Sequence, residues 1–295
     1  MAQLPQLAPD DVGTLIPSAT AIEFVESGGQ KTVFRARISD RQYALKFALL
    51  PGPVDPEDDL PEVVARASRE VETMRDCSSQ YMVKLGPLGL TYGTVGTQSL
   101  VFFSQEFIDG ISVKSVAEQG RQLSVPEVVK LGLQMTDAIS ALWEIGKVHR
   151  DIKPGNIMRE AASGNFILLD AGLAFDIVGE SLSAGFPVGT MPYFSPEQFD
   201  YSNRRILDFR SDMFSLGTTL YEAATRRHPF WAPGDSAAVL YSRITKAAPT
   251  RPRDLNQEIP EGLERVILRM LGKSPHLRYR KCAQLISDLR EALGT

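Results

Sequence analysis

The segment VHRDIKPGNIM, residues 148–158, places several reactive side chains on one loop. His149, Arg150, Asp151, Lys153 and Asn156 fall within eight positions, beside a Pro-Gly turn. A carboxylate can accept a proton, a lysine can balance negative charge, and an amide oxygen can bind a hard cation. Such a loop suits a reaction that holds two reactants and a metal ion in register.

A second carboxylate stands in the apolar run LLDAGLAF, residues 168–175. Asp170 follows two leucines and precedes Ala171. Burying a carboxylate among apolar neighbours is costly unless a cation meets it. Taken alone, such an aspartate is more typical of a turn or of the first residue of a helix.

In this order, HRDIKPGN and LLDAGL resemble the catalytic and metal-binding segments of eukaryotic-like (Hanks-type) Ser/Thr protein kinases, in the style of their bacterial branch. The resemblance implies that Asp151 accepts or orients the proton of the substrate hydroxyl and that Lys153 steadies the transferring phosphate. It also implies that Asn156 and Asp170 are the two protein ligands of Mg²⁺, which bridges the phosphates of ATP.

Upstream, the resemblance assigns an ion pair to Lys46 in YALKFAL and Glu70 in SREVETM. Lys46 would hold the α- and β-phosphates, and Glu70, on the following helix, would hold Lys46. A lone lysine in a strand usually faces solvent, so this assignment depends on the order of the motifs.

The expected phosphate loop, ESGGQKTVF at residues 26–34, departs from the family pattern. Only Gly28 occupies a family glycine, and Glu26 and Lys31 stand where the first and third glycines would be. Gly28 and Gly29 still allow the backbone to approach phosphates closely, and Lys31 could add a positive charge. A plain hairpin turn is the alternative interpretation of this stretch.

The segment FFSQEFIDG, residues 102–110, resembles the hinge of the family. By alignment Gln105 guards the back pocket, and backbone groups of Glu106 and Ile108 bond the adenine edge. Three apolar residues, which are equally ordinary core residues, would sandwich the adenine ring: Val33, Ala44 and Met158.

Downstream, VGTMPYFSPEQF at residues 188–199 resembles the end of a kinase activation segment. The resemblance implies an ion pair between Glu197 and Arg278, and a bridge from Thr190 to the catalytic loop. Asp212 would bond the backbone of that loop, which is a stabilising role and not a chemical one.

Two features raise questions of regulation. Ala171 replaces the phenylalanine that usually follows the metal-binding aspartate, so how firmly the active arrangement is held becomes an open question. Arg150, just before Asp151, suggests control by phosphorylation, because a phosphate can neutralise an arginine. Ser181 and Ser183 are the candidate acceptors, and autophosphorylation implies possible self-association.

The resemblance therefore predicts an ATP- and Mg²⁺-dependent Ser/Thr protein kinase that phosphorylates protein hydroxyls and itself. A pseudokinase, a signalling scaffold that binds nucleotide without turnover, is the first alternative, supported by the irregular phosphate loop and Ala171. A kinase of small molecules is the second, but it does not explain SPEQF, Asp212 and Arg278. The protein substrate is not identified by the sequence.

The surrounding elements predict an α+β, bilobal fold that positions these residues. Short segments rich in β-branched and aromatic residues indicate strands in AIEFVES, TVFRARISD, RQYALKFALL and LVFFSQEFI. Helical spacing appears in PEVVARASREVETMRDC and, after residue 112, in four further segments. We expect an N-terminal extension over 1–19 (a linker or a cap on the small lobe), a nucleotide-binding lobe over 20–109 and a helical lobe over 110–292.

Bulk properties agree with an ordinary globular chain. Its 295 residues are 43% hydrophobic and 23% charged, with a formal net charge of -4, which does not favour a nucleic-acid partner. Cys77 and Cys282 predict reduced thiols, because their spacing fits no metal site. With no secretory signal and no apolar run long enough to span a bilayer, we expect a soluble cytoplasmic protein, or the soluble part of a longer one.

Overall fold

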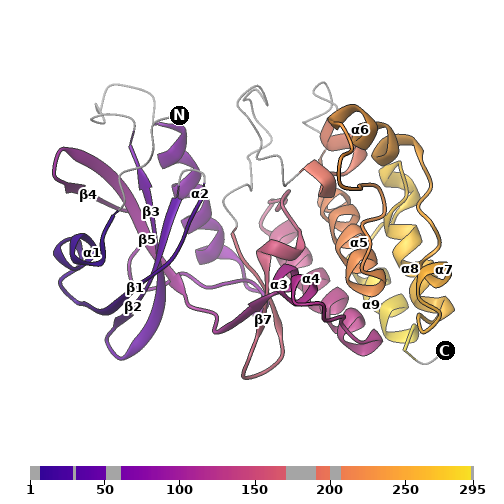
Figure 1. Ribbon diagram of the computed structural model, residues 1–295, viewed down its shortest axis with the longest axis horizontal. Coiled ribbons are helices and arrows are strands. Elements are labelled where there is room, and N and C mark those ends of the chain that lie inside the picture. Colours follow the sequence, from indigo (N-terminus) through magenta and orange to yellow (C-terminus); the bar gives the residue numbers. More distant parts are fainter. Residues whose placement is uncertain (1–6, 29–30, 51–60, 171–190, 200–206, 294–295) are drawn as a thin grey trace. The chain divides into compact units, whose positions relative to one another are not determined.

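The computed structural model describes residues 7–28, 31–50, 61–170, 191–199 and 207–293 (Figure 1). The chain divides into two compact units. The first comprises residues 1–76 and 83–108, and the second comprises residues 77–82 and 109–295.

The first unit is built on a five-stranded antiparallel sheet in the order β1-β2-β3-β5-β4. The strands are β1 (Ala19–Gly28), β2 (Lys31–Ile38), β3 (Arg41–Leu49), β4 (Thr91–Val95) and β5 (Gln98–Glu106). Ser39 and Asp40, both with positive φ, form the two-residue turn between β2 and β3, which suits the twist of a tight hairpin. The predicted strand at 32–40 therefore ends at Ile38.

Alternation along β2 separates two faces of the sheet. Thr32, Phe34, Ala36 and Ile38 are buried, whereas the residues between them are less so. Phe34, Ala36 and Ile38 join a core that includes residues of the helix α1 (Pro9–Leu15) and of the segment that follows it. The opposite face of the sheet carries Lys31 and Val33 of β2, together with the β3 residues that pair with them.

The N-terminal segment is part of this core. Val12, on α1, is fully buried, and Ile16 and Ala19 are nearly so. Of the two interpretations of residues 1–19, the described part supports a cap on the sheet.

The helix α2 (Glu62–Asp76) completes the first unit. It buries the residues that helical spacing places on one face, including Val64, Ala67, Val71 and Met74, as the sequence predicted. Glu70 lies on the same buried face, so its carboxylate needs a cationic partner.

The second unit is mainly helical. Its helices are α3 (Val113–Glu118), α4 (Val125–Glu144), α5 (Phe209–Thr225), α6 (Ala237–Lys246), α7 (Pro252–Leu255), α8 (Glu261–Met270) and α9 (Cys282–Glu291), with short 3-10 turns at Pro154–Asn156, Met191–Tyr193, Pro196–Phe199 and Pro275–Leu277. A small antiparallel sheet contains β6 (Gly110–Ser112), β7 (Ile157–Glu160) and β8 (Phe166–Leu168). The α4 helix packs against both α5 and α9, and α5 also packs against α8.

Local signals account for the long helix α4. The Glu127 carboxylate accepts hydrogen bonds from the backbone N–H of Ser124 (3.0 Å) and from its hydroxyl (2.9 Å), which is the predicted capping box. The α5 helix is buried along nearly its whole length, as its apolar sequence indicated. These two helices flank, in sequence, the loop that carries the candidate catalytic residues.

Candidate active site

Asp212 of α5 stabilises the loop between α4 and β7 by accepting hydrogen bonds from the loop backbone. The backbone N–H groups of His149 and Arg150 donate to the two carboxylate oxygens of Asp212, each at 2.7 Å. Arg150 has φ +66°, a conformation that costs energy for a residue with a side chain. Burial raises the pKa of Asp212, against the opposing effects of His149 and the two N–H donors. The predicted contact between Asp212 and the loop backbone is confirmed.

Asp151 lies at the centre of this loop. Its two carboxylate oxygens are each 2.9 Å from Lys153 Nζ. The Asn156 side-chain amide donates to Asp151 Oδ2 (2.8 Å) and to the Asp151 carbonyl (2.9 Å). Asp151 is only 6% exposed, and this burial raises the pKa of its carboxyl despite the opposing charge of Lys153.

His149 joins this loop to the segment that contains Asp170. Its Nδ1 accepts from the Asp151 N–H (3.3 Å), so a neutral ring would donate from Nε2 to the Leu169 carbonyl at 3.1 Å. In addition, the Leu169 N–H donates to the Asn156 carbonyl at 2.8 Å. Asn156 and Asp170, the two predicted metal ligands, therefore stand on adjoining backbone segments.

The donor atoms of these two residues fit Mg²⁺. Because the Asn156 NH₂ group is directed at Asp151, the atom that Asn156 can offer a cation is its amide oxygen. Asp170 has φ +56° and is a partly exposed residue. Two protein oxygens are a common protein contribution to Mg²⁺ when substrate phosphates and water complete the coordination. Among the described residues, no group of three or more His, Cys, Asp or Glu could hold a metal ion.

The first unit contains the predicted ion pair of Lys46 on β3 and Glu70 on α2. The Lys46 Nζ lies 2.5 Å from Glu70 Oε1, and the Glu70 side chain is fully buried. A second lysine joins it: Lys31 Nζ lies 2.6 Å from Glu70 Oε2. Sequence reasoning placed Lys31 beside phosphates but missed its contact with Glu70, which the register of β2 and β3 could have indicated.

The strand register groups part of the expected adenine site on one sheet face. Val33 is paired with Lys46, and Ala44 is paired with Gln105. Gln105 is buried, and its side-chain oxygen has no hydrogen-bond partner among the described residues. Gly28 ends β1 opposite Lys31.

The hinge residues differ in what their backbones can offer. The Glu106 N–H already donates to the Lys84 carbonyl at 2.8 Å, so Glu106 would present its carbonyl to a ligand. Ile108, which follows the end of β5, is largely buried. Met158, on β7, belongs to the second unit.

The predicted pair of Glu197 and Arg278 is confirmed as a bidentate contact. Two guanidinium nitrogens of Arg278 lie 2.6 and 2.8 Å from the carboxylate oxygens of Glu197, and the Ser211 hydroxyl donates to Glu197 at 2.7 Å. Burial alone would raise the pKa of Glu197, but Arg278 and Ser211 overcome it and hold this pKa below the ordinary value.

Residues 21–288 match the protein kinase domain family. The chain belongs to this family. It is 28% identical over 272 residues to the serine/threonine-protein kinase PknE of Mycobacterium tuberculosis, a match that covers 92% of this chain and 45% of the relative. It is 32% identical over 239 residues to the serine/threonine-protein kinase Pkn1 of Myxococcus xanthus, covering 79% of this chain and 33% of the relative.

A probable serine/threonine-protein kinase of Clostridium perfringens is 26% identical over 272 residues, covering 92% of this chain and 37% of the relative. The kinase domain thus spans less than half the length of these relatives. The expectations of a bacterial Hanks-type Ser/Thr kinase and of an α+β kinase fold are confirmed.

Several expectations for the kinase domain lie outside the described residues. They concern Gly29 of the phosphate loop, Ala171, Thr190, and the candidate phosphate acceptors Ser181 and Ser183. In the part of the chain that the structure describes, no helix is both long and apolar enough to cross a bilayer.

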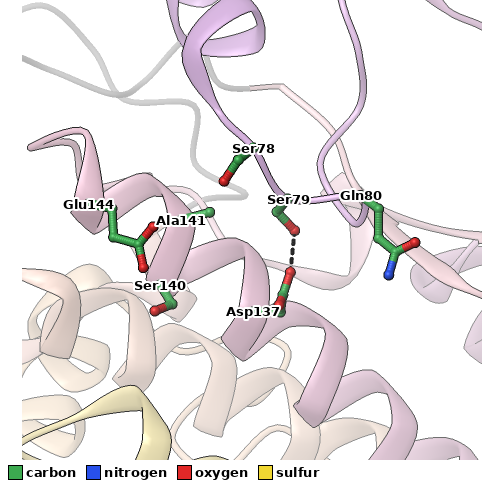
Figure 2. Close-up of a pocket in the computed structure, with 7 residues that line it drawn as sticks. All are labelled: Ser78, Ser79, Gln80, Asp137, Ser140, Ala141 and Glu144. Atoms are coloured by element: carbon green, nitrogen blue, oxygen red, sulfur yellow. Dashed lines mark hydrogen bonds between the residues drawn. The ribbon is translucent and has the colours of Figure 1, made fainter.

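A polar cavity of the kinase domain lies apart from the predicted site residues, none of which lines it. It has a volume of about 310 Å³ and is bordered by one face of α4 and by the loop that follows α2 (Figure 2). The Ser79 hydroxyl donates to Asp137 within it at 2.5 Å. The lining residues are Ser78, Ser79, Gln80, Asp137, Ser140, Ala141 and Glu144.

Proposed function

We propose that this kinase domain transfers the γ-phosphoryl group of ATP to serine and threonine hydroxyls of proteins, its own chain included. The observation that carries the proposal is the arrangement around Asp151, a buried carboxylate held between the Lys153 ammonium and the Asn156 amide. A carboxylate fixed in this way can orient a hydroxyl and receive its proton without first reorganising.

The residues of the second unit would act on the transferring group. Asp151 would accept the proton of the attacking hydroxyl, while Lys153 would balance the negative charge that develops on the phosphoryl oxygens. Asn156 and Asp170 would hold Mg²⁺ through oxygen atoms. When bound, the metal ion would neutralise part of the negative charge of the ATP phosphates.

The residues of the first unit would bind the nucleotide. Lys46, held by Glu70, would contact the α- and β-phosphates, and the backbone at Gly28 and Gly29 would approach them. The carbonyl of Glu106 and the backbone of Ile108 would bond the adenine edge, with Gln105 beside them. The apolar contacts of the ring would come from Val33, Ala44 and Met158.

The test follows phosphate from labelled ATP and Mg²⁺ into the chain and into a generic protein acceptor. We expect Asp151→Asn to lower transfer by roughly 10²–10⁴-fold, which is the usual contribution of a general base. Nucleotide binding, followed by thermal shift, should persist in this variant. Asp254→Asn, the same change at an exposed residue of α7, should transfer phosphate like the wild type.

The outcomes separate the proposal from its first alternative. Transfer by the wild type that disappears in Asp151→Asn supports a kinase. Nucleotide binding with no transfer to any acceptor would contradict the proposal and favour a pseudokinase. Transfer that survives in Asp151→Asn would mean that Asp151 does not accept the proton of the attacking hydroxyl.

A further inference from the structure

Two lysines share one buried carboxylate in the first unit. Lys46 of β3 contacts one oxygen of Glu70 and Lys31 of β2 contacts the other, at 2.5 and 2.6 Å. The Glu70 side chain is fully buried, while the Lys31 side chain is 20% exposed and that of Lys46 is 9% exposed. Lys31 therefore has the more accessible side chain of the two lysines.

The convergence follows from the register of the sheet. Lys31 is paired with Ala48, and Lys46 with Val33, in the antiparallel ladder of β2 and β3. Lys31 and Val33 are two positions apart, so they lie on the same face as Lys46. Lys31 and Lys46 are thus diagonal neighbours, which typically lie about 7–8 Å apart, with a somewhat shorter distance between their Cβ atoms. Side chains as long as lysine can both reach one carboxylate from such positions.

The charges of this group match an anionic ligand. Two ammonium groups converge on the single carboxylate of Glu70, and an ammonium group can also donate to a phosphate oxygen. Lys31 begins β2, directly after the Gly28–Gln30 segment at which the phosphate loop is expected. A lysine here offers charge-assisted hydrogen bonds to phosphate oxygens where a glycine would offer only backbone.

Resting on the proposed function, we propose that Lys31 is a second phosphate-binding lysine that acts together with Lys46. When one ammonium group turns to the nucleotide phosphates, the other remains on Glu70, so the buried carboxylate is never left uncompensated. The two lysines then replace each other in part, and neither is the sole cationic contact of the phosphates.

The first test measures affinity by calorimetry on the whole chain, for ATP with Mg²⁺ and for adenosine, which lacks phosphates. We expect Lys31→Met to weaken ATP binding about tenfold or more, the loss typical of a charge-assisted contact, and to leave adenosine binding unchanged. Arg37→Met removes a cation from the same face of β2 at an exposed position and should change neither affinity. Lys31→Arg should restore most of the ATP affinity.

Two results would overturn the proposal. Unchanged ATP affinity in Lys31→Met would mean that Lys31 contacts no phosphate. Equal losses of affinity for ATP and adenosine would mean that Lys31 only stabilises the packing of α2 against the sheet. The pair of ligands thus separates phosphate binding from a loss of structure, and circular dichroism of each variant checks folding.

The second test is a double-mutant cycle on phosphate transfer. If the lysines replace each other, Lys46→Met keeps measurable transfer, and Lys31→Met/Lys46→Met loses more than the product of the single losses. If the loss of phosphate transfer in the double variant equals the product of the losses in the two single variants, the proposed exchange of roles between the lysines is overturned. Should the wild type transfer no phosphate at all, the proposed function fails, while the difference between ATP and adenosine still decides the role of Lys31.

Discussion

At the scale of single residues, the candidate site depends on backbone conformations that the chain would not adopt unaided. Arg150 and Asp170 both have positive φ, at 66° and 56°. Each such residue costs of order 1–3 kcal/mol and persists only where neighbouring contacts hold it. For Arg150 the contacts include the bond from its N–H to Asp212 and the bond from Gln198 to its carbonyl (3.2 Å).

Asp212→Asn tests this support. The introduced side-chain amide keeps one acceptor oxygen, but its NH₂ group faces a backbone N–H and cannot accept from it. One buried hydrogen bond is therefore lost, at a cost of about 1–3 kcal/mol. We expect kcat for phosphate transfer to fall about tenfold or more, with little change in KM for ATP, because Asp212 touches no reactant. Steady-state kinetics measure both quantities, and a rise in KM with constant kcat would contradict the expectation.

At the scale of elements, buried contacts between neighbouring helices and turns set the stability of the second unit. The Arg278 side chain, which is fully buried, joins the turn before α9 to Glu197 and to the carbonyls of Arg210 and Gly272, each at 2.8 Å. Its guanidinium therefore binds three separate segments. Removing one partner of such a pair leaves a buried charge poorly compensated.

Glu197→Gln should destabilise the second unit by about 3–5 kcal/mol at neutral pH, measured by denaturant unfolding. The sign of its pH dependence follows from the lowered pKa of Glu197. The contribution is fully present above the ordinary glutamate pKa of 4.5 and is lost as the pH falls through the lower folded value. The wild type should therefore lose more stability than Glu197→Gln as the pH is lowered through this range.

The control for that change is Glu261→Gln, which breaks an exposed pair with Arg265 in α8. Such pairs contribute about 0.3–0.5 kcal/mol, so little change is expected. Equal effects of the two substitutions would show that the Glu197 pair is no more than a surface contact.

Close approach of α5 and α8 at Gly217 gives a second prediction. A Cβ atom at this position would lie 2.7 Å from the Cβ of Met270, which cannot move without its helix. Gly217→Ala should destabilise the second unit by about 1–3 kcal/mol, although alanine favours helices by about 1 kcal/mol. Thermal unfolding measures the effect.

Gly13→Ala in α1 is the matched opposite. Its Cβ would lie 3.5 Å from Ile22 Cδ1, an ordinary contact, so a gain of about 0.4–1 kcal/mol is expected. Stabilisation by both substitutions would mean that α5 and α8 can separate at no cost.

At the scale of the whole molecule, the described residues form two hydrophobic cores, one in each unit. The two tryptophans of the sequence, Trp143 and Trp231, both belong to the second unit. Tryptophan fluorescence therefore reports unfolding of the second unit.

The substitution Val12→Ala tests whether the two units unfold independently. Val12 is fully buried in the core of the first unit, and its truncation should cost that unit roughly 1–3 kcal/mol. We expect loss of strand signal in circular dichroism at lower denaturant, with the tryptophan transition unchanged. A common shift of both signals would show that the two cores unfold as one cooperative body.

The family could be predicted from the sequence because its motifs are short and follow one another in a fixed order. Asp151, Lys153 and Asn156 are neighbours on one loop, so their types and spacing already imply contact. The pairs whose members lie far apart in sequence were predicted from the resemblance. They are Lys46 with Glu70, Glu197 with Arg278, and Asp212 with the loop that carries Asp151. Each is a contact that the order of the motifs anticipates.

Other features depend on contacts that no local pattern contains. The burial of α1 in the sheet core joins segments that propensity alone leaves ambiguous between a linker and a cap. The left-handed Arg150 is set by a carboxylate on α5, 62 positions away in sequence. The hydrogen-bond register of β2 and β3 brings Lys31 beside Lys46, and helix packing brings Glu70 to both. Local sequence sets which groups are available, but a buried charge acquires its partners only when strand register and helix packing determine which groups meet.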